Sequence, residues 1–417
     1  MGFPLVICNN NEFNIKEYEN NKHADFWFNF NKFKVFTVRT IDEIPVGGKY
    51  TVYLSVYSDF YNEDYSPRYS WIDGANGSVT GYHFTMPERI WNDSHAGLVT
   101  WIVEWNTESN LWDRIDFRGM LNALNISHIP ERLWFLTAAE TDNGYNPRIK
   151  DYLENTIGIR VYHSNGLDKF CTAASLGEDY YRHVGQKLES ISKRTITPYK
   201  AVCYNRRPRE HRVLMLSHMR NRGYIDRVIH SLGLGNFGVS NISKEHFPYM
   251  IDDMEFYTNR SHDIKPQEDE TNIDLEVNQA HAVCFPHGLK SQLHIVSESV
   301  TTEHTFITEK SYKPFLMMQP FIQYGNVDNV KAIKMRGFDT FDKWIDHSYD
   351  TENDDMLRLK YFFKELDRLM AFSDVQWAEM MYDMADTLCY NAELVERVQP
   401  HFPIKYFIKE LMDFYNS

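Results

Sequence analysis

The chain has 417 residues, enough for two domains of ordinary size, and its 43% hydrophobic content can supply sizeable cores. Its net charge of −14 argues against a general nucleic-acid coat and against a basic membrane binder. The five cysteines are widely spaced and form no CxxC pair, which argues against a disulfide framework and a cysteine zinc site and predicts a reducing compartment. With no apolar stretch of about 18 residues, the sequence predicts a cytoplasmic protein without a membrane span.

The first half of the chain alternates strand-like and helix-like segments. Strand patterns occur at 50–57, 98–105, 132–137 and 159–162. A helical pattern at 117–124 lies between two of these strands, and strands separated by helices indicate a parallel sheet with crossover connections. We expect residues 1–195 to form one doubly wound α/β domain.

A second alternation follows in the C-terminal half. Strand patterns occur at 199–204, 294–297 and 320–324, and helical patterns at 209–222 and 308–318. These segments predict a second α/β domain over 196–372, followed by a helical tail over 373–417. The fold expected is thus α/β, with two doubly wound, Rossmann-like domains that face each other across a cleft.

One basic island lies in this acidic chain. Residues 191–240 hold ten Lys and Arg against two Asp and Glu, and the run Asn205–Arg212 contains four arginines directly after a strand. Arginine offers a forked set of donors that suits phosphate. Arg209 and Arg212 are three residues apart on one helix face at the helix start, so we expect them to contact the same phosphate-containing ligand. Arg220 and Arg222 are then candidates for an acceptor-side rim; the alternative is that these arginines are solvated or pair with carboxylates.

The most informative stretch is residues 294–325. A strand leads to Glu298, and after a polar loop Thr308-Glu309-Lys310 opens a helical segment. A helix start presents free N–H groups and the positive end of the dipole, and Lys310 adds a charge, which together suit a diphosphate. Glu309 is suited to accept hydrogen bonds from ribose hydroxyls. The alternative is that Thr308 and Glu309 merely cap the helix.

This stretch resembles the sugar-nucleotide signature of α1,3-fucosyltransferases and related GT-B enzymes. Glu298-Ser299-Val300 stands for the Glu-Asn-Ser element, residues 306–310 match the element that ends in Thr-Glu-Lys, and residues 320–325 match the strand that ends near Gly. The sequence departs from the pattern at Ser299 and Val300. Residues 337–350 are also similar to a segment of many phage-encoded proteins, which would place the protein in a host cytoplasm.

The resemblance implies a glycosyltransferase of the GT-B type that transfers a sugar with inversion and without a metal. Its donor-binding residues would be Arg209, Arg212, Glu298, Thr308, Glu309 and Lys310. The sugar nucleotide is a co-substrate, so no cofactor is expected. The cationic side chains would stabilise the charge that grows on the departing nucleoside diphosphate.

An inverting transfer also needs a base that deprotonates the acceptor hydroxyl. Glu104 ends the predicted strand at 98–105 and Glu108 lies just beyond it, where α/β sheets place functional groups. We favour Glu104 or Glu108 for this role. Glu140, which follows the next strand, is an alternative, and each of the three is also explained as an ordinary surface carboxylate.

The acceptor stays open at this stage. A glycan fits the resemblance, whereas a hydroxymethylated base in phage DNA fits the phage-like segment and the arginine excess, although the net charge counts against DNA. A non-catalytic nucleotide-sugar or glycan-binding protein on the same scaffold is the alternative to an enzyme. The spacing of His281, Cys284, His287 and His294 matches no zinc pattern, and neither a dinucleotide-binding GxGxxG nor a P-loop motif occurs.

Overall fold

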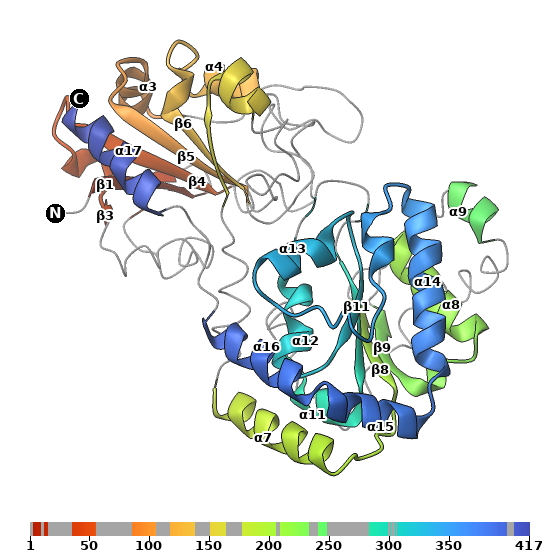
Figure 1. Ribbon diagram of the computed structural model, residues 1–417. Coiled ribbons are helices and arrows are strands. Elements are labelled where there is room, and N and C mark those ends of the chain that lie inside the picture. The colour runs from red at the N-terminus through yellow and green to blue at the C-terminus, as the bar shows by residue number, and fades with distance from the viewer. Residues whose placement is uncertain are drawn as a thin grey trace. The chain divides into compact units, whose positions relative to one another are not determined.

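The computed structural model describes residues 3–9, 12–15, 36–55, 86–105, 117–137, 151–163, 177–205, 209–232, 241–247, 283–298, 301, 305, 307–397 and 404–417 (Figure 1). The chain divides into two compact units. The first comprises Met1–Leu167 with Pro400–Ser417, and the second comprises Asp168–Gln399. Both units combine helices with a sheet of mainly parallel strands, so the fold is α/β.

A seven-stranded sheet forms the first unit, in the order β2-β1-β4-β5-β6-β7 with β3 beside β1. Its strands are β1 (Phe3–Asn9), β2 (Glu12–Ile15), β3 (Phe36–Val38), β4 (Tyr50–Ser55), β5 (Val99–Trp105), β6 (Leu133–Thr137) and β7 (Arg160–His163). The hairpin pair β1 and β2 is antiparallel, and the other pairs are parallel. The helical elements between them are η2 (Ile41–Glu43), α3 (Glu88–His95), α4 (Phe117–Ala123), η3 (Pro130–Arg132) and the π-helix η4 (Tyr152–Ile157).

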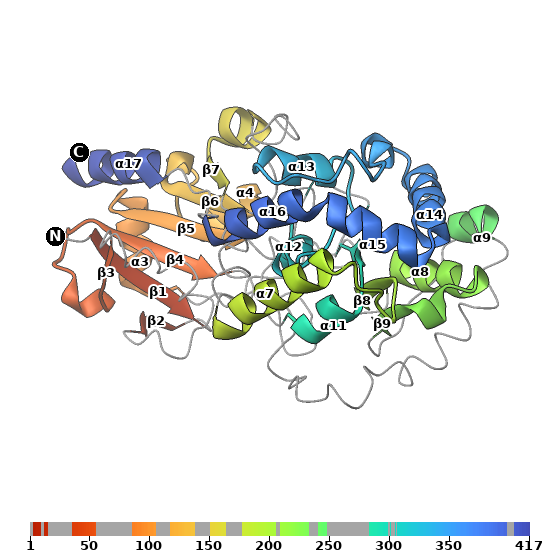
Figure 2. The same ribbon diagram turned by 60° about the horizontal axis from the view of Figure 1, so that its bottom comes forward.

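The two faces of this sheet are covered differently. On one face, Trp101 and Phe135 pack with Ile90 of α3 and Met120 of α4. On the other face, strand residues such as Trp134 form a second core with Leu411 of the last helix, α17 (Ile404–Asn416). Figures 1 and 2 show α17 lying along this sheet.

The segment 373–417, expected as one helical tail, is therefore divided between the two units: α17 belongs to the first unit and the helices before Gln399 to the second. Within the first unit, Lys49 Nζ donates to the Phe414 carbonyl at 2.8 Å, and the Tyr415 hydroxyl donates to the Pro4 carbonyl at 3.1 Å. These contacts and the burial of Leu411 explain why α17 packs on the N-terminal sheet.

A four-stranded parallel sheet in the order β11-β10-β8-β9 forms the second unit. Its strands are β8 (Ala201–Asn205), β9 (Val228–Leu232), β10 (Leu293–Ser297) and β11 (Phe321–Tyr324). The helices are α7 (Glu178–Ser192), α8 (Glu210–Asn221), α9 (Asn241–His246), α11 (Phe285–Lys290), α12 (Lys313–Leu316), α13 (Asn329–Met335), α14 (Asp355–Ala371), α15 (Asp374–Asp383) and α16 (Ala385–Arg397), with the 3-10 turns η5 (Ile225–Arg227), η8 (Glu309–Ser311) and η9 (Ser348–Thr351).

Helices cover both faces of this second sheet. Figure 1 shows α8 and α14 on one side, and α7, α11, α12 and α16 on the other. Side chains alternate accordingly along β11, where Phe321 packs on Phe315 of α12 and Tyr324 packs on Phe362 of α14. This is the doubly wound arrangement expected from the alternating pattern of the sequence.

Helix α7 belongs to the second unit, although its residues lie within the 1–195 range expected for the first domain. The His183 ring is hydrogen-bonded to the Met317 carbonyl at 3.0 Å. The buried Lys187 ammonium donates to the carbonyls of Gly288 at 2.6 Å and Ser291 at 2.8 Å. The boundary between the units falls at 167/168 because α7 is anchored in this way. Among the described helices, none is long and apolar enough to cross a membrane.

Candidate functional site

The strand order of the second sheet places a topological switch point between β8 and β10. The connection from β8 runs through α8 to β9 on one side, and the connection from β10 runs through η8 and α12 to β11 on the other. In open α/β sheets, ligands bind outside the carboxyl ends of the strands at such a point. The two basic or polar motifs singled out in the sequence both lie here, at Arg209–Arg212 and at Glu298–Lys310.

The start of α8 is anchored to the end of β10. The His211 ring nitrogen Nε2 lies 3.0 Å from the Glu298 carbonyl oxygen, and Arg212 Nη2 donates to the same oxygen at 3.1 Å. Burial, together with the neighbouring charges of Arg212 and Arg209, lowers the pKa of His211 to about 3, so its ring is neutral and donates through Nε2. Burial also lowers the pKa of Arg212, to about 10, which leaves its guanidinium charged at neutral pH.

This arrangement places cations where a helix disfavours them. Arg209 occupies the N-cap of α8 and Arg212 lies in its first turn, at the positive end of the helix dipole. The carbonyl of Arg209 accepts the first helical bonds, from the amides of Arg212 and Val213, and among the described residues no side chain caps the helix. Glu210 and His211 come before the first amide that donates a helical hydrogen bond, so their N–H groups lie at the open end of the helix. Such a start suits an anion, which both the amides and the guanidinium groups attract.

Glu298 organises the facing segment. Its buried carboxylate accepts hydrogen bonds from the Thr308 hydroxyl at 2.7 Å, the Thr308 amide at 3.3 Å and the Ser311 hydroxyl at 2.6 Å. Gly325 lies directly behind it, since a Cβ at Gly325 would lie 3.1 Å from Glu298 Cβ and 2.3 Å from Asn329 Nδ2. Glu298 therefore holds the Thr308–Ser311 turn in place. The sequence grouped it with the residues that contact the donor, but the structure gives its carboxylate this internal role.

Glu309 and Lys310 form an ion pair. Lys310 Nζ lies 2.6 Å from Glu309 Oε1 and 3.3 Å from the Thr308 hydroxyl oxygen. Burial alone raises the pKa of Glu309, but the ammonium groups of Lys310 and Lys313 outweigh burial and lower it. The three predicted residues of the Thr-Glu-Lys element are thus a compact polar unit, and the charge of Glu309 also acts on Arg212.

The helix expected over 308–318 is interrupted, so that prediction was wrong in extent. The structure has the single 3-10 turn η8 followed by the four-residue helix α12. Pro314 explains the break because it has no N–H to donate to the Lys310 carbonyl. Thr308 still caps the turn, since its hydroxyl accepts from the Lys310 amide at 3.3 Å. A turn this short contributes little dipole, so Lys310 itself is the main attraction for an anion on this side.

Two polar side chains at the strand ends were not singled out from the sequence. Asn205 ends β8 and Ser297 ends β10, and both are buried. Within the part of the chain that the structure describes, Asn205 Oδ1 and Ser297 Oγ have no hydrogen-bond partner. Buried polar atoms of this kind need a partner, which a bound ligand or an ordered water supplies. The signal in the sequence that could have identified Asn205 and Ser297 is their position at the ends of two predicted strands.

Arg220 and Arg222 lie elsewhere. They are at the last turn and C-cap of α8, about 15–20 Å from its start at 1.5 Å per residue. Arg222 Nη2 pairs with Asp367 Oδ2 of α14 at 3.2 Å, and His218 Nε2 lies 2.8 Å from the other oxygen of the same carboxylate. The structure therefore does not bring Arg220 and Arg222 to the rim of the switch point.

The predicted catalytic bases are not placed. Glu104 is the sixth residue of β5, and its backbone pairs with Ser55 and Leu136. The structure does not describe its side chain. Glu108, Glu140, Arg206 and Arg207 lie outside the described residues.

The described residues contain no group of three His, Cys, Asp or Glu side chains that would hold a metal ion. Two of the histidines considered as zinc ligands form hydrogen bonds with other residues. His287 Nδ1 lies 2.6 Å from the Tyr204 hydroxyl, and His294 Nδ1 lies 3.3 Å from Gln319 Oε1.

Comparison with known proteins adds little. No family model matches the chain, and no curated protein matches it. One solved structure with a related arrangement is the N-terminal domain of Candida albicans trehalose-6-phosphate phosphatase, at 6% sequence identity and a TM-score of 0.37, with 91% of this chain and 75% of that chain covered. At this level of similarity the match carries no argument about function.

Proposed function

We propose that this protein is a GT-B glycosyltransferase that moves a sugar from a sugar nucleotide to an acceptor hydroxyl without a metal ion. The observation that supports the proposal best is the placement of Arg209 and Arg212 at the positive end of the α8 dipole, beside the switch point and the Thr-Glu-Lys turn. The helix dipole disfavours this placement in the absence of an anion, although the carboxylates of Glu298 and Glu309 favour the charge of Arg212. Positions where a sequence breaks a local rule are often functional sites.

The donor's diphosphate is the anion that fits these groups. Its oxygens would accept hydrogen bonds from the Arg209 and Arg212 guanidinium groups and from the first amides of α8, while Lys310 approaches from the other side. Glu309 is ionised and would accept hydrogen bonds from ribose hydroxyls. Asn205 Oδ1 and Ser297 Oγ are buried atoms at the same strand ends with capacity for a further donor group.

The same cations would also lower the barrier. When the glycosidic bond breaks, its electron pair stays with the nucleoside diphosphate, and fixed positive charges stabilise that oxygen as its charge grows. Glu104 or Glu108 would take the proton of the acceptor hydroxyl, which attacks the anomeric carbon from the opposite face. The acceptor would be a glycan or a hydroxymethylated base in DNA.

A thermal-shift screen of sugar nucleotides tests the proposal. A ligand at about 100 times its Kd adds about 2.7 kcal/mol to the free energy of unfolding, a shift of roughly 5–10 °C for a unit of this size. We expect at least one sugar nucleotide to raise the Tm of the wild type but not of Arg209→Ala. Arg222→Ala, at the other end of the same helix, is the control and should respond like the wild type.

A transfer assay with the identified donor then separates an enzyme from a binding protein. Release of nucleoside diphosphate that depends on an added acceptor supports transfer. A complete screen in which no sugar nucleotide shifts the Tm would contradict the proposal.

A further inference from the structure

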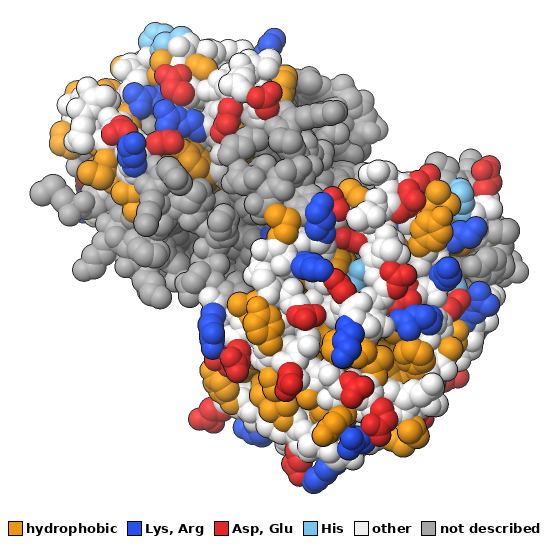
Figure 3. All heavy atoms as spheres, in the orientation of Figure 1, with side chains coloured by type: hydrophobic (Ala, Val, Ile, Leu, Met, Phe, Trp, Pro, Cys, Tyr) orange, Lys and Arg blue, Asp and Glu red, His pale blue; other side chains and the backbone are white. Residues whose placement is uncertain are grey.

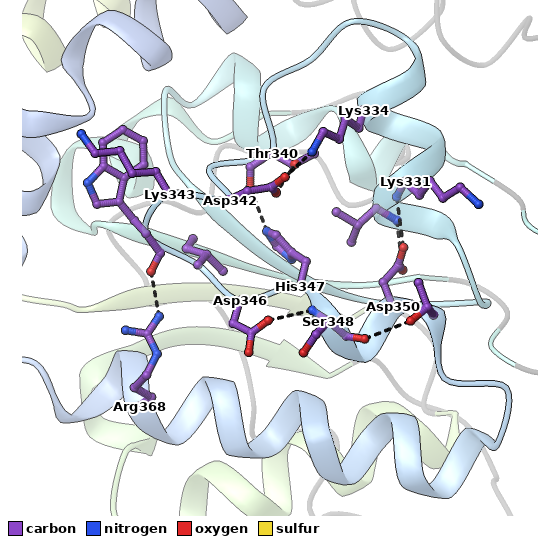
Figure 4. A pocket seen from close by; sticks show the side chains of 14 residues that line it. Lys331, Lys334, Thr340, Asp342, Lys343, Asp346, His347, Ser348, Asp350 and Arg368 are labelled. Carbon is purple, nitrogen blue, oxygen red and sulfur yellow. Dashed lines mark hydrogen bonds and ion pairs between the residues drawn. The ribbon is translucent and has the colours of Figure 1, made fainter.

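A second site lies on the outer side of the same sheet. A pocket of about 560 Å³ is walled by α13, the loop at 340–348, η9 and Arg368 of α14 (Figure 4). The loop covers the edge strand β11, where the Tyr349 hydroxyl accepts a hydrogen bond from the Gln323 amide at 3.1 Å. The pocket is therefore separated from the β8/β10 strand ends by β10 and β11, and its volume is in the range of small-ligand sites.

Hydrogen bonds fix the walls of this pocket. The Thr340 hydroxyl donates to Asp342 at 2.5 Å, and Asp342 also pairs with Lys334 of α13. The His347 ring, neutral because burial lowers its pKa, donates through Nε2 to the Thr340 carbonyl at 2.8 Å. Arg368 Nη2 donates to the Trp344 carbonyl at 2.7 Å. The site is thus largely formed before any ligand arrives.

The charges around the pocket are mixed. Lys331, Lys334, Lys343 and Arg368 bring positive groups, and Asp342, Asp346 and Asp350 bring carboxylates. Asp350 accepts from the amides of Val330 and Lys331 at 3.0 Å, so it caps α13, and burial raises its pKa to about 7, which makes it a weaker negative group than the other two. Asp346 is more open: one oxygen accepts from the Ser348 amide at 2.9 Å, and this bond lowers the pKa of the carboxyl, which stays ionised.

This mixture selects against strongly charged ligands. A phosphate would face Asp342 and Asp346, and a metal cation would face three lysines and an arginine. Figure 3 shows the same interspersion of acidic and basic side chains over the visible face of the second unit, without a continuous basic field of the kind duplex DNA requires. Hydroxyl groups, in contrast, both donate and accept, and so match closely spaced carboxylates and ammonium groups.

The pocket also has an apolar part. Trp344 provides most of it, because Ile345 and Val330 of the lining are buried in the core, and the Lys343 ammonium lies 4.6 Å from the centroid of the Trp344 ring. A ligand with hydroxyls on its edges and C–H groups on its faces would use both kinds of surface, as pyranose rings do.

We infer that this pocket binds a neutral saccharide and anchors a sugar unit away from the donor site. The choice of a saccharide over other neutral polyols rests on the proposed function, since a sugar-transferring enzyme meets glycans as acceptors or products. Asp346 is the acceptor for the sugar hydroxyls, the lysines of the rim donate to them, and Trp344 contacts a ring face.

Saturation-transfer NMR of the full chain, without sugar nucleotide, tests this inference. The probes are glucose, galactose, N-acetylglucosamine, fucose and lactose, with the dipeptide Lys-Glu as a comparison. Inorganic phosphate has no C–H protons to observe, so it is added as a competitor of the saccharide signals. Asp346→Ala removes one charged acceptor and should weaken saccharide binding roughly 10–150-fold. Ser348→Trp fills the pocket and keeps its charges, so it should abolish binding; Asp383→Ala, an exposed carboxylate of α15 outside the lining, should have no effect.

The outcomes separate this site from the donor site. Saccharide signals that persist in Lys310→Ala and disappear in Ser348→Trp support the pocket, whatever the result with sugar nucleotides. Three results would overturn it: no neutral saccharide bound up to roughly 10 mM, phosphate or the dipeptide bound in preference, or saccharide signals lost in Lys310→Ala and kept in Ser348→Trp. The last result would leave the proposed function standing.

Discussion

The two ends of helix α8 carry the same kind of residue in opposite electrostatic settings. At its start, Arg209 and Arg212 lie at the positive end of the dipole, and Arg212 points inward to the carbonyls of Ser297 and Glu298. At its end, Arg222 lies at the negative end of the dipole and pairs with Asp367. The arginines at the end are explained by helix and ion-pair energetics. At the start, the dipole opposes both charges, although the carboxylates of Glu298 and Glu309 favour that of Arg212. We propose that this unfavourable placement serves a ligand.

Loss of Lys310 should have the largest effect on transfer. Lys310→Ala removes the cation of the Thr-Glu-Lys turn, and loss of one group that stabilises developing charge costs about 2.7–4 kcal/mol in the transition state, or roughly 10²–10³ in kcat. Steady-state kinetics with the identified donor measures this, and Lys360→Ala, at an exposed lysine of α14 outside the lining of the second pocket, is the matched control. Turnover close to that of the wild type in a folded Lys310→Ala protein would remove the role assigned to Lys310.

The start of α8 should also be sensitive to acid. The pKa of His211 is lowered to about 3 in the folded chain from about 6.5 in the unfolded chain, so the unfolded state binds more protons between these values. The stability that His211 contributes is therefore full above pH 6.5 and is lost as the pH falls toward 3, with a slope of at most about 1.4 kcal/mol per pH unit.

Urea titrations at several pH values measure this slope, and the difference between the wild type and His211→Gln isolates it from the other buried histidines. An unchanged slope in His211→Gln would show that the ring is not held neutral at the α8 start.

Charge reversal at the end of α8 should have a small effect. Arg220→Glu with Arg222→Glu removes an exposed pair with Asp367, which contributes about 0–1 kcal/mol to stability, and should leave sugar-nucleotide binding unchanged. If DNA is the acceptor and these arginines contact it, the slope of log K against log salt should flatten by about 0.9 per lost phosphate contact.

Binding of hydroxymethylated DNA at several salt concentrations decides between the acceptors. No retention of such DNA by the wild type at low salt, with donor present, would leave a glycan as the acceptor.

Chelation should have the smallest effect of all. Lys310, Arg209 and Arg212 are assigned the charge stabilisation that a metal supplies in other enzymes, so EDTA should leave the transfer rate unchanged. Full loss with EDTA and recovery with Mn²⁺ or Mg²⁺ would contradict the cationic side-chain mechanism.

The strands with strong alternating or apolar patterns could be predicted from sequence. The predicted strands at 98–105 and 132–137 correspond to β5 and β6, and the helix at 209–222 corresponds to α8. Strand β9 was missed, since its VIHSL sequence has polar residues at its centre and lies beside charged residues. The packing of α7 and α17 was also missed, because burial of Tyr180 or Leu411 against distant residues leaves no local pattern.

The parts of the candidate site with an unusual residue pattern could be predicted from the sequence. Arginines after a strand and a Thr-Glu-Lys element stand out in the printed sequence, and the structure brings both to one switch point. The inward role of Glu298 was less accessible, since it depends on Ser311 and on the close approach of Gly325. The helix over 308–318 was predicted from the cap position of Thr308, and it was too long because Pro314 interrupts the helical hydrogen bonds.

The most direct test compares the two ends of α8 by titration calorimetry with the sugar nucleotide that the screen identifies. Arg209→Ala and Arg222→Ala remove one arginine each from the same helix. Our account predicts that Arg209→Ala weakens binding by about 1.5–3 kcal/mol, roughly 10–150-fold in Kd, because a charged hydrogen bond to the diphosphate is lost, whereas Arg222→Ala binds like the wild type. Equal affinities for the two variants, or a larger loss in Arg222→Ala, would contradict the claim that the start of α8 is the anion site.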